Sequence, residues 1–267
     1  MGTGGGIDKK VCYKKHKNKI KRDTAMTMKR IIMALVMGAT VSATALAQSE
    51  KPQPYFTPEE MPNMLNTPLA PPDSLSAAFQ YDMARYLWGK SVRETPRGEL
   101  AKRDAEYGMS WLCKEFSEPF GLEISPEHTP EIYRLLNDAL FTCDELCWTP
   151  KSTFMRRRPF MVFHEPSGMP KDDAALSKNG SFPSGHTLFG WSAALLLTEI
   201  NPYRADTLIA RGYMYGESRV IVGAHWQSDV NAGYLYASVA VAKLHTSPAF
   251  MKQLEKAKKE FARLKKK

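Results

Sequence analysis

The stretch GSFPSGHTLFGWSAALLLTEINP, residues 180–202, combines a turn rich in glycine, serine and proline with a long apolar segment. The apolar part, from His186 to Glu199, predicts a helix buried in the core. This helix ends at Asn201-Pro202, because proline cannot continue a helix. Neither this segment nor the apolar segment 232–242 offers the roughly 18 unbroken apolar residues that a membrane helix needs. We therefore expect two core helices and no membrane span.

Helical spacing continues on both sides of that stretch, from Ser74 onward. Apolar residues recur three and four positions apart, as in Leu75, Ala78 and Phe79, and Thr129-Pro130-Glu131 is typical of a helix start. No convincing alternation predicts a strand, and no internal repeat is present. The sequence thus predicts an all-α, single-domain fold. Besides 186–199, the expected helices cover about 74–87, 100–116, 130–146, 203–220, 228–245 and 248 onward.

The N-terminus has the features of an export signal. Met28-Lys29-Arg30 is a basic start before an apolar stretch, and Ala45-Leu46-Ala47 is the small-x-small pattern of a cleavage site. We expect a signal peptide over residues 28–47, a mature chain that begins at Gln48, and a periplasmic or secreted protein. Residues 1–27 do not fit that signal and are either an artefactual start or an extended leader.

The rest of the chain divides into three parts by composition. Residues 48–73 are rich in Pro, Asn and Thr and predict an extended or partly disordered arm. Residues 74–251 contain most of the helical patterns and form the expected domain. Residues 252–267 are Lys-rich and predict a solvated helix end, with contact to an anionic membrane as the alternative.

The formal net charge of +9 is concentrated at the two ends of the chain. Residues 1–47 and 252–267 contain the basic excess, whereas acidic residues outnumber basic ones between 48 and 251. This distribution is not typical of a surface that binds a nucleic-acid polymer.

Three cysteines follow the expected signal peptide, namely Cys113, Cys143 and Cys147. Their helical surroundings favour small buried side chains, but one disulfide that joins Cys113 to either of the others stays open. Cys143 and Cys147 have no His or Cys partner at zinc-ligand spacing, so we expect no metal and no cofactor.

Three short segments contain groups that bind or attack an oxyanion. In Lys151–Pro159, basic residues precede a proline, which alone indicates a solvated face. In Gly180–Thr187, flexible backbone leads directly into a helix whose first N–H groups favour an anion, although Ser184 could simply cap that helix. In Ser218–Asp229, His225 and Asp229 are four residues apart, so on a helix they would share one face and form a hydrogen bond, or a purely structural pair.

Together the three segments resemble the signature of the type 2 phosphatidic acid phosphatase superfamily, PAP2. That signature is Lys-x6-Arg-Pro, then Pro-Ser-Gly-His, then Ser-Arg-x5-His-x3-Asp, and every specified residue type is present here in order. The membrane-free chain resembles in particular the bacterial class A non-specific acid phosphatases, although Phe182 replaces their common Tyr. The matching positions are Lys151, Arg158, Pro159, Pro183, Ser184, Gly185, His186, Ser218, Arg219, His225 and Asp229.

The resemblance implies an all-α bundle of the PAP2/haloperoxidase type with a phosphate-binding site. Lys151, Arg158 and Arg219 would surround the phosphoryl oxygens, and Ser184 and Gly185 would add hydrogen bonds to them. Arginine suits this role because its planar guanidinium makes paired contacts with phosphate.

The resemblance also implies the catalytic residues of a metal-independent acid phosphatase. His225, oriented by Asp229, would attack phosphorus to form a phosphohistidine, and His186 would protonate the leaving group and then activate water. Phosphate monoesters would be the substrates, with phosphotransfer to alcohols as a side activity. We expect Arg156 and Arg157 to be surface groups.

Two alternatives belong to the same superfamily: a vanadium-dependent haloperoxidase, which is usually a longer chain, and a lipid phosphatase, which places its site among membrane helices. The sequence does not define the preferred ester or the oligomeric state, and a homo-oligomer stays open.

Overall fold

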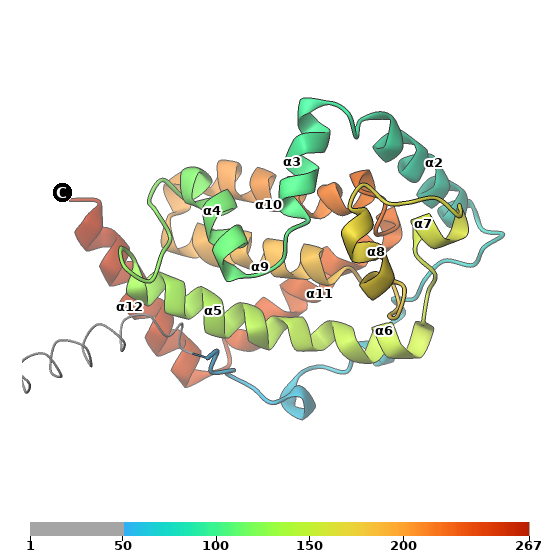
Figure 1. Ribbon diagram of the computed structural model, residues 1–267. Coiled ribbons are helices and arrows are strands. Elements are labelled where there is room, and N and C mark those ends of the chain that lie inside the picture. Colours follow the sequence, from blue (N-terminus) through green and yellow to red (C-terminus); the bar gives the residue numbers. More distant parts are fainter. Residues whose placement is uncertain (1–50, 267) are drawn as a thin grey trace, which may run out of the picture. The chain divides into compact units, whose positions relative to one another are not determined.

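Helix α9 (Gly185–Ile200) lies at the centre of the fold and contacts α5, α10, α11 and α12. The computed structural model describes residues 51–266, and no residue among them forms a β-strand. Figure 1 shows α5, α9, α10 and α11 running beside one another. The all-α prediction is confirmed, whereas the proposed signal peptide and leader lie outside the described residues.

The elements follow the chain in this order: η1 (Pro58–Glu60), η2 (Met64–Asn66), α2 (Ala77–Ser91), α3 (Pro96–Asp104), α4 (Met109–Phe120), α5 (Pro130–Asp144), η3 (Glu145–Cys147), α6 (Trp148–Phe154), α7 (Pro159–Val162), α8 (Pro170–Leu176), α9, η4 (Pro202–Arg204), α10 (Ala205–Ile221), α11 (Gln227–Leu244) and α12 (Pro248–Leu264). The long helices predicted over 130–146, 186–199, 203–220, 228–245 and from 248 are confirmed within a few residues.

Small residues allow α9 and α10 to approach closely. A Cβ atom on Gly190 would lie 2.3 Å from the Tyr215 ring, and one on Gly212 would lie 2.5 Å from Ala194 Cβ. Leu188, Ala193 and Leu197 of α9 have no exposed surface. The apolar stretch 186–199 is therefore buried on nearly all sides, as its composition predicts.

The single helix expected over 100–116 is wrong. The chain forms α3 and α4 instead, because Gly108 between them has a φ of 123°, which a helix does not contain. Helix α3 begins earlier than expected, at Pro96, where the Thr95 side chain accepts a hydrogen bond from the Gly98 amide.

Near its start, the segment 52–73 is joined to α5, and its η2 turn contacts α6. The Gln53 amide donates to Asp138 Oδ1 at 2.8 Å, and the Tyr55 amide donates to Thr142 Oγ1 at 3.0 Å. Met64 is buried in the core. The segment thus lies as an arm over the helical domain, with Met61 and Met64 as its buried residues.

Cys113, Cys143 and Cys147 are buried free thiols, which answers the question of a disulfide that the sequence leaves open. Burial raises the pKa of the Cys113 and Cys143 thiols to about 12. They therefore behave as small apolar side chains.

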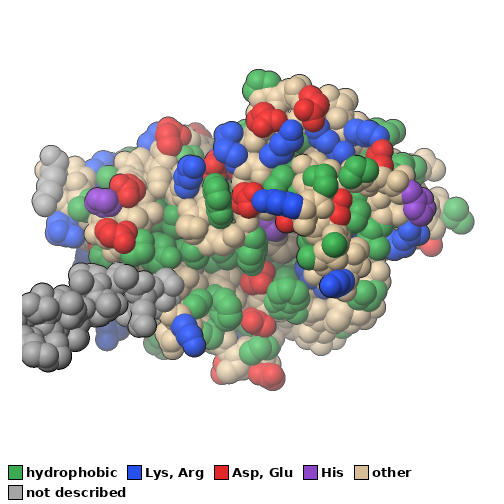
Figure 2. Space-filling model, in the orientation of Figure 1, with side chains coloured by type: hydrophobic (Ala, Val, Ile, Leu, Met, Phe, Trp, Pro, Cys, Tyr) green, Lys and Arg blue, Asp and Glu red, His purple; other side chains and the backbone are tan. Residues whose placement is uncertain are grey.

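None of the helices between residues 51 and 266 is long and apolar enough to cross a membrane. Basic and acidic side chains are interspersed over the face of the molecule that Figure 2 shows.

Candidate active site

The three sequence segments meet at one pocket of about 430 Å³. It is formed at the N-terminal end of α9, with α6, α8 and the turn between α10 and α11 around it. Six of the expected site residues line it: Lys151, Arg158, Gly185, His186, Arg219 and His225. Ser184 and Asp229 lie behind this wall.

Close backbone contacts join the first two segments. Gly180 has no room for a side chain, since a Cβ atom there would lie 2.4 Å from the Lys151 carbonyl oxygen. The Ser181 amide donates to the Arg156 carbonyl at 2.9 Å, and Lys151 Nζ donates to the Gly180 carbonyl at 3.1 Å. Glycine at position 180 thus allows the basic segment to lie against the start of α9.

Ser184 has the structural role that its sequence position also allowed. Its Oγ accepts hydrogen bonds from the Thr187 amide at 3.3 Å and from Thr187 Oγ1 at 2.9 Å, which caps α9. Its own amide donates to the Asp229 carbonyl at 3.0 Å and so joins the second segment to the third. Gly185, in the first turn of α9, lines the pocket at the positive end of the helix dipole.

Three buried cations surround the pocket. Burial and the neighbouring Arg158 lower the pKa of Lys151 to about 8, and burial with Arg219 lowers the pKa of Arg158 to about 10. Burial also lowers the pKa of Arg219 to about 10. Within residues 51–266, Arg219 Nε and Nη1 have no hydrogen-bond partner. Such a concentration of unneutralised positive charge is suited to an anion with several oxygens.

His225 presents Nε2 to this cationic cluster, and Arg158 Nη1 lies 2.9 Å from it. Because a guanidinium can only donate, Nε2 is the acceptor and the ring proton is on Nδ1. Asp229 Oδ2 lies 3.5 Å from Nδ1, an ion-pair distance longer than a hydrogen bond. Burial, and then Arg158, Lys151 and Arg219, lower the pKa of His225 well below its usual value, so the ring is neutral.

The expectation that His225 and Asp229 share one face of a helix is wrong. Helix α11 begins only at Gln227, and His225 lies in the turn before it. Asp229 Oδ2 instead accepts a hydrogen bond from the Trp226 amide at 2.9 Å, which closes the first turn of the helix. The four-residue spacing brings the two side chains together through this turn.

His186 lies on the opposite side of the cluster, in the first turn of α9. Its Nε2 lies 3.0 Å from the Ala105 carbonyl oxygen, so Nε2 carries a proton and Nδ1 is the other functional nitrogen. Burial, then Arg219 and His225, lower the pKa of His186 well below its usual value. In the pocket without an anion, both histidines are therefore neutral.

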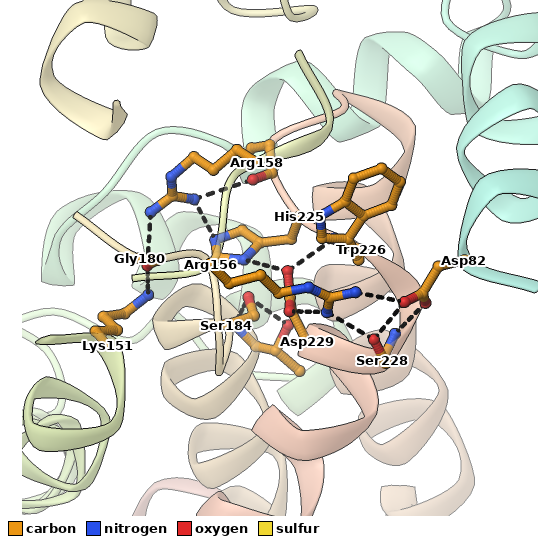
Figure 3. Close-up of polar contacts among 12 residues, drawn as sticks. Asp82, Lys151, Arg156, Arg158, Gly180, Ser184, His225, Trp226, Ser228 and Asp229 are labelled. Carbon is orange, nitrogen blue, oxygen red and sulfur yellow. Dashed lines mark hydrogen bonds and ion pairs between the residues drawn. The ribbon is translucent and has the colours of Figure 1, made fainter. Parts of the chain in front are cut away.

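Arg156 is not the surface group that we expected. Its side chain is only 9% exposed, and it forms ion pairs with Asp229 at 2.5 Å and with Asp82 at 2.7 Å (Figure 3). Arg157 is exposed as predicted and donates to the Met161 carbonyl. The position of Arg156 between two required residues of the first segment is the only sequence signal of its role.

Several pocket residues are not among those predicted. Tyr107, Asp144, Cys147 and Trp148 line the wall beside Lys151. Burial raises the pKa of Asp144 to about 6. Its position two helical turns before Lys151 could have indicated it, whereas Tyr107 comes from the loop between α3 and α4 and has no such signal.

The other three histidines between residues 51 and 266 have no part in this pocket wall. His164 does not line it, His128 lies in the loop before α5, and His245 caps the end of α11. No group of three or more His, Cys, Asp or Glu side chains that could hold a metal ion occurs in the described part of the chain.

A search with protein-family models matches residues 136–252 to the PAP2 superfamily. The matched region contains all three segments of the pocket.

Curated proteins resemble most of the chain. A non-specific acid phosphatase of Providencia stuartii is 42% identical over 90% of this chain and 100% of its own length. A non-specific acid phosphatase of Salmonella typhimurium is 40% identical over 79% of this chain and 85% of its own. An acid phosphatase of Zymomonas mobilis is 34% identical over 86% and 89% of the two chains.

Proposed function

Since the chain belongs to the PAP2 superfamily and to its non-specific acid phosphatases, we propose that it hydrolyses phosphate monoesters through a phosphohistidine on His225. The names of its relatives favour this activity over a haloperoxidase or a lipid phosphatase. The export-signal pattern that the sequence predicts over residues 28–47 supports the further proposal that the enzyme is exported to the periplasm or secreted.

One observation carries the mechanism: a neutral histidine acceptor lies among three cations in one pocket. His225 Nε2 is 2.9 Å from Arg158, and Lys151 and Arg219 line the same wall. In phosphoryl transfer the protein mainly positions the groups and offsets negative charge. The cations would hold the phosphoryl oxygens while Nε2 exchanges its contact with Arg158 for the phosphorus atom.

The reaction then follows in two steps. In the first, Nε2 of His225 bonds to phosphorus, the ester P–O bond breaks, and His186 gives its Nδ1 proton to the leaving alkoxide. In the second, His186 Nδ1 takes a proton from water, the hydroxide attacks phosphorus, and the P–N bond breaks to release inorganic phosphate. An alcohol in place of water would give transphosphorylation.

The bound anion would allow His186 to take up from solvent the proton that it donates in the first step. Burial, and then the charge of Arg219, lower the pKa of His186, and a phosphate dianion beside the cations would offset their charge and raise this pKa. Ala105 holds Nε2, so the second proton enters on Nδ1.

Trapping of the phosphoenzyme tests the proposal. The enzyme is mixed with a ³²P-labelled monoester at acidic pH and quenched in alkali, where phosphohistidine survives. With an aryl ester, whose leaving group needs no protonation, we expect label on wild-type protein that acid removes, no label on His225→Ala, and increased label on His186→Ala, in which the second step lacks its general base. Acid-stable label, or label that persists in His225→Ala, would contradict the mechanism.

A further inference from the structure

A buried ion-pair network lies behind His225, on the side away from the pocket. Figure 3 shows Arg156 between the carboxylates of Asp82 and Asp229. We propose that Asp82 and Arg156 are positioning residues that set the orientation and net charge of Asp229, and through it the reactivity of His225. The inference rests on the proposed role of His225 as nucleophile.

The carboxylate of Asp229 is held on both oxygens. Oδ1 accepts from Arg156 Nη1 at 2.5 Å, and Oδ2 accepts from the Trp226 amide at 2.9 Å. With both oxygens engaged the carboxylate cannot rotate freely, and Oδ2 stays directed towards Nδ1 of His225 at 3.5 Å. By orienting Asp229, Arg156 therefore favours the tautomer of His225 that has its proton on Nδ1 and its free lone pair on Nε2.

Asp82 fixes the other arm of the guanidinium. Its Oδ2 accepts from Arg156 Nη2 at 2.7 Å and from Ser228 Oγ at 2.6 Å, and its Oδ1 accepts from the Ser228 amide at 2.7 Å. Helix α2 is thereby joined to the first turn of α11. A planar guanidinium holds the two carboxylates in a fixed geometry, which the point charge of a lysine ammonium does not impose.

The charge balance gives Asp82 a second role. Arg156 alone would neutralise Asp229, but Asp82 returns the group of three to a net charge of −1. Asp82 is 1% exposed and Asp229 is fully buried, so solvent screens this charge weakly. The His225 ring becomes cationic when it is phosphorylated, and a net negative group beside Nδ1 stabilises that state.

Positive charges also face His225 from the pocket, and the negative charge of the network opposes them. Arg158, Lys151 and Arg219 lower the pKa of the ring from the pocket side, and His186 lies across the same cluster. Asp229 is the carboxylate closest to the ring in the described structure. Neutralising Asp82 would leave the cations opposed by a fully compensated Asp229–Arg156 pair.

The first test is Asp82→Asn, which keeps an acceptor oxygen but removes the charge. We expect kcat/KM to fall on the order of 10- to 100-fold, the range found when outer partners of orienting groups are removed. Competitive inhibition by inorganic phosphate should stay within about twofold, because Asp82 does not line the pocket. Glu217→Gln is the matched control. Glu217 forms an ion pair at 2.8 Å with Arg85, which lies in α2 as Asp82 does, and it does not contact Asp229.

The second test is a double-mutant cycle. Arg156→Gln leaves two buried carboxylates without a cation between them, so one of them holds a proton to higher pH. We expect the acid limb of the pH–rate profile of Arg156→Gln to move to higher pH. We also expect the double variant Asp82→Asn/Arg156→Gln to have a kcat/KM at least threefold higher than that of Arg156→Gln. Should Arg156→Gln not fold, the comparison of Asp82→Asn with Glu217→Gln decides alone.

The inference is overturned if Asp82→Asn behaves like Glu217→Gln, or if the two changes in the cycle are simply multiplicative. Phosphoenzyme trapping separates this failure from failure of the proposed function. If the wild-type enzyme is labelled on His225 and Asp82→Asn keeps its kcat/KM, only the inference about Asp82 is contradicted. If the label is on another residue of the wild-type enzyme, the proposed mechanism itself is contradicted.

Discussion

Asp144 is a carboxylate whose surroundings disfavour its ionised form. It faces Cys147, Lys151 and Tyr107 in the pocket wall, and burial raises its pKa from 3.8 to about 6. The folded protein therefore binds this proton more tightly than the unfolded chain does, so ionised Asp144 destabilises the fold. The penalty is fully present above pH 6 and disappears as the pH falls below 3.8.

Asp144→Asn should consequently stabilise the protein at pH 8, by about 1–3 kcal/mol, and have little effect at pH 4. Urea unfolding at both pH values measures the difference. Asp172→Asn, another pocket-lining aspartate, serves as the control. An equal gain for Asp144→Asn at both pH values would show that ionisation is not the cause.

The two histidines predict an acidic pH–rate profile. In the proposed mechanism His225 attacks as the neutral base, and its lowered pKa favours the neutral ring into the acid range. His186 must donate a proton, so the rate falls as rising pH deprotonates it, and Lys151 loses its charge near its pKa of about 8. We expect kcat to persist to higher pH than kcat/KM, because bound phosphate raises the pKa of His186. A rate that rises steadily above pH 8 would contradict this assignment.

Single residues show how far sequence patterns extend. Lys151, Arg158 and Arg219 were predictable because the three segments specify them, and the structure places all three in one pocket. Arg156 was misjudged, because a basic side chain beside two others has no sequence mark of burial. Its environment depends on Asp82, which is 74 positions away in the chain.

At the level of helices, α5 and α12 are joined by an unusual cap. Glu260 of α12 accepts hydrogen bonds from the Glu131 and Ile132 amides, both at 3.0 Å, at the start of α5. These amides have no partner within their own helix, and the negative charge lies at the positive end of its dipole.

Glu260→Ala should therefore lower the free energy of unfolding by about 1–2 kcal/mol, the range for loss of a helix cap. Glu255→Ala in the same helix is the control, because Glu255 is exposed and lies 4.0 Å from Lys258. Denaturant unfolding of both variants gives the comparison. Equal losses would mean that helix propensity, and not the cap, accounts for the effect.

Helix boundaries were predictable where a cap or proline marks them and were missed elsewhere. Thr129-Pro130 and Ser247-Pro248 mark the starts of α5 and α12 correctly. The apolar spacing from 100 to 116 continues through Gly108, so periodicity alone could not show that the chain turns there. The short helices α6, α7 and α8 carry too few residues for any period to be detected.

For the molecule as a whole, the second half could be interpreted from sequence and the first half could not. Most of the expected pocket residues lie between residues 151 and 229, where the three motif segments occur. The predicted all-α class follows from the helical spacing of apolar residues. Tyr107 and Asp82 come from the first half and reach the site only because α2, α3 and α4 pack against α10. Such proximity is a result of packing, which a local pattern does not contain.

The same packing explains why this enzyme should work without a divalent cation. Phosphatases that use metals employ them to offset phosphate charge and to activate water. Here Lys151, Arg158 and Arg219 converge on one pocket, and in the proposed mechanism they offset the charge while His186 activates water.

We therefore expect dialysis against EDTA to leave kcat and KM unchanged, and added Mg²⁺ or Zn²⁺ to give no stimulation. Charge supplied by side chains has a different signature, which is sensitivity to their removal. Arg219→Gln should raise the inhibition constant for inorganic phosphate by at least tenfold, since two of its donors have no other partner within residues 51–266. A loss of activity in EDTA that a divalent cation restores, together with unchanged phosphate binding by Arg219→Gln, would show that a metal does this work instead.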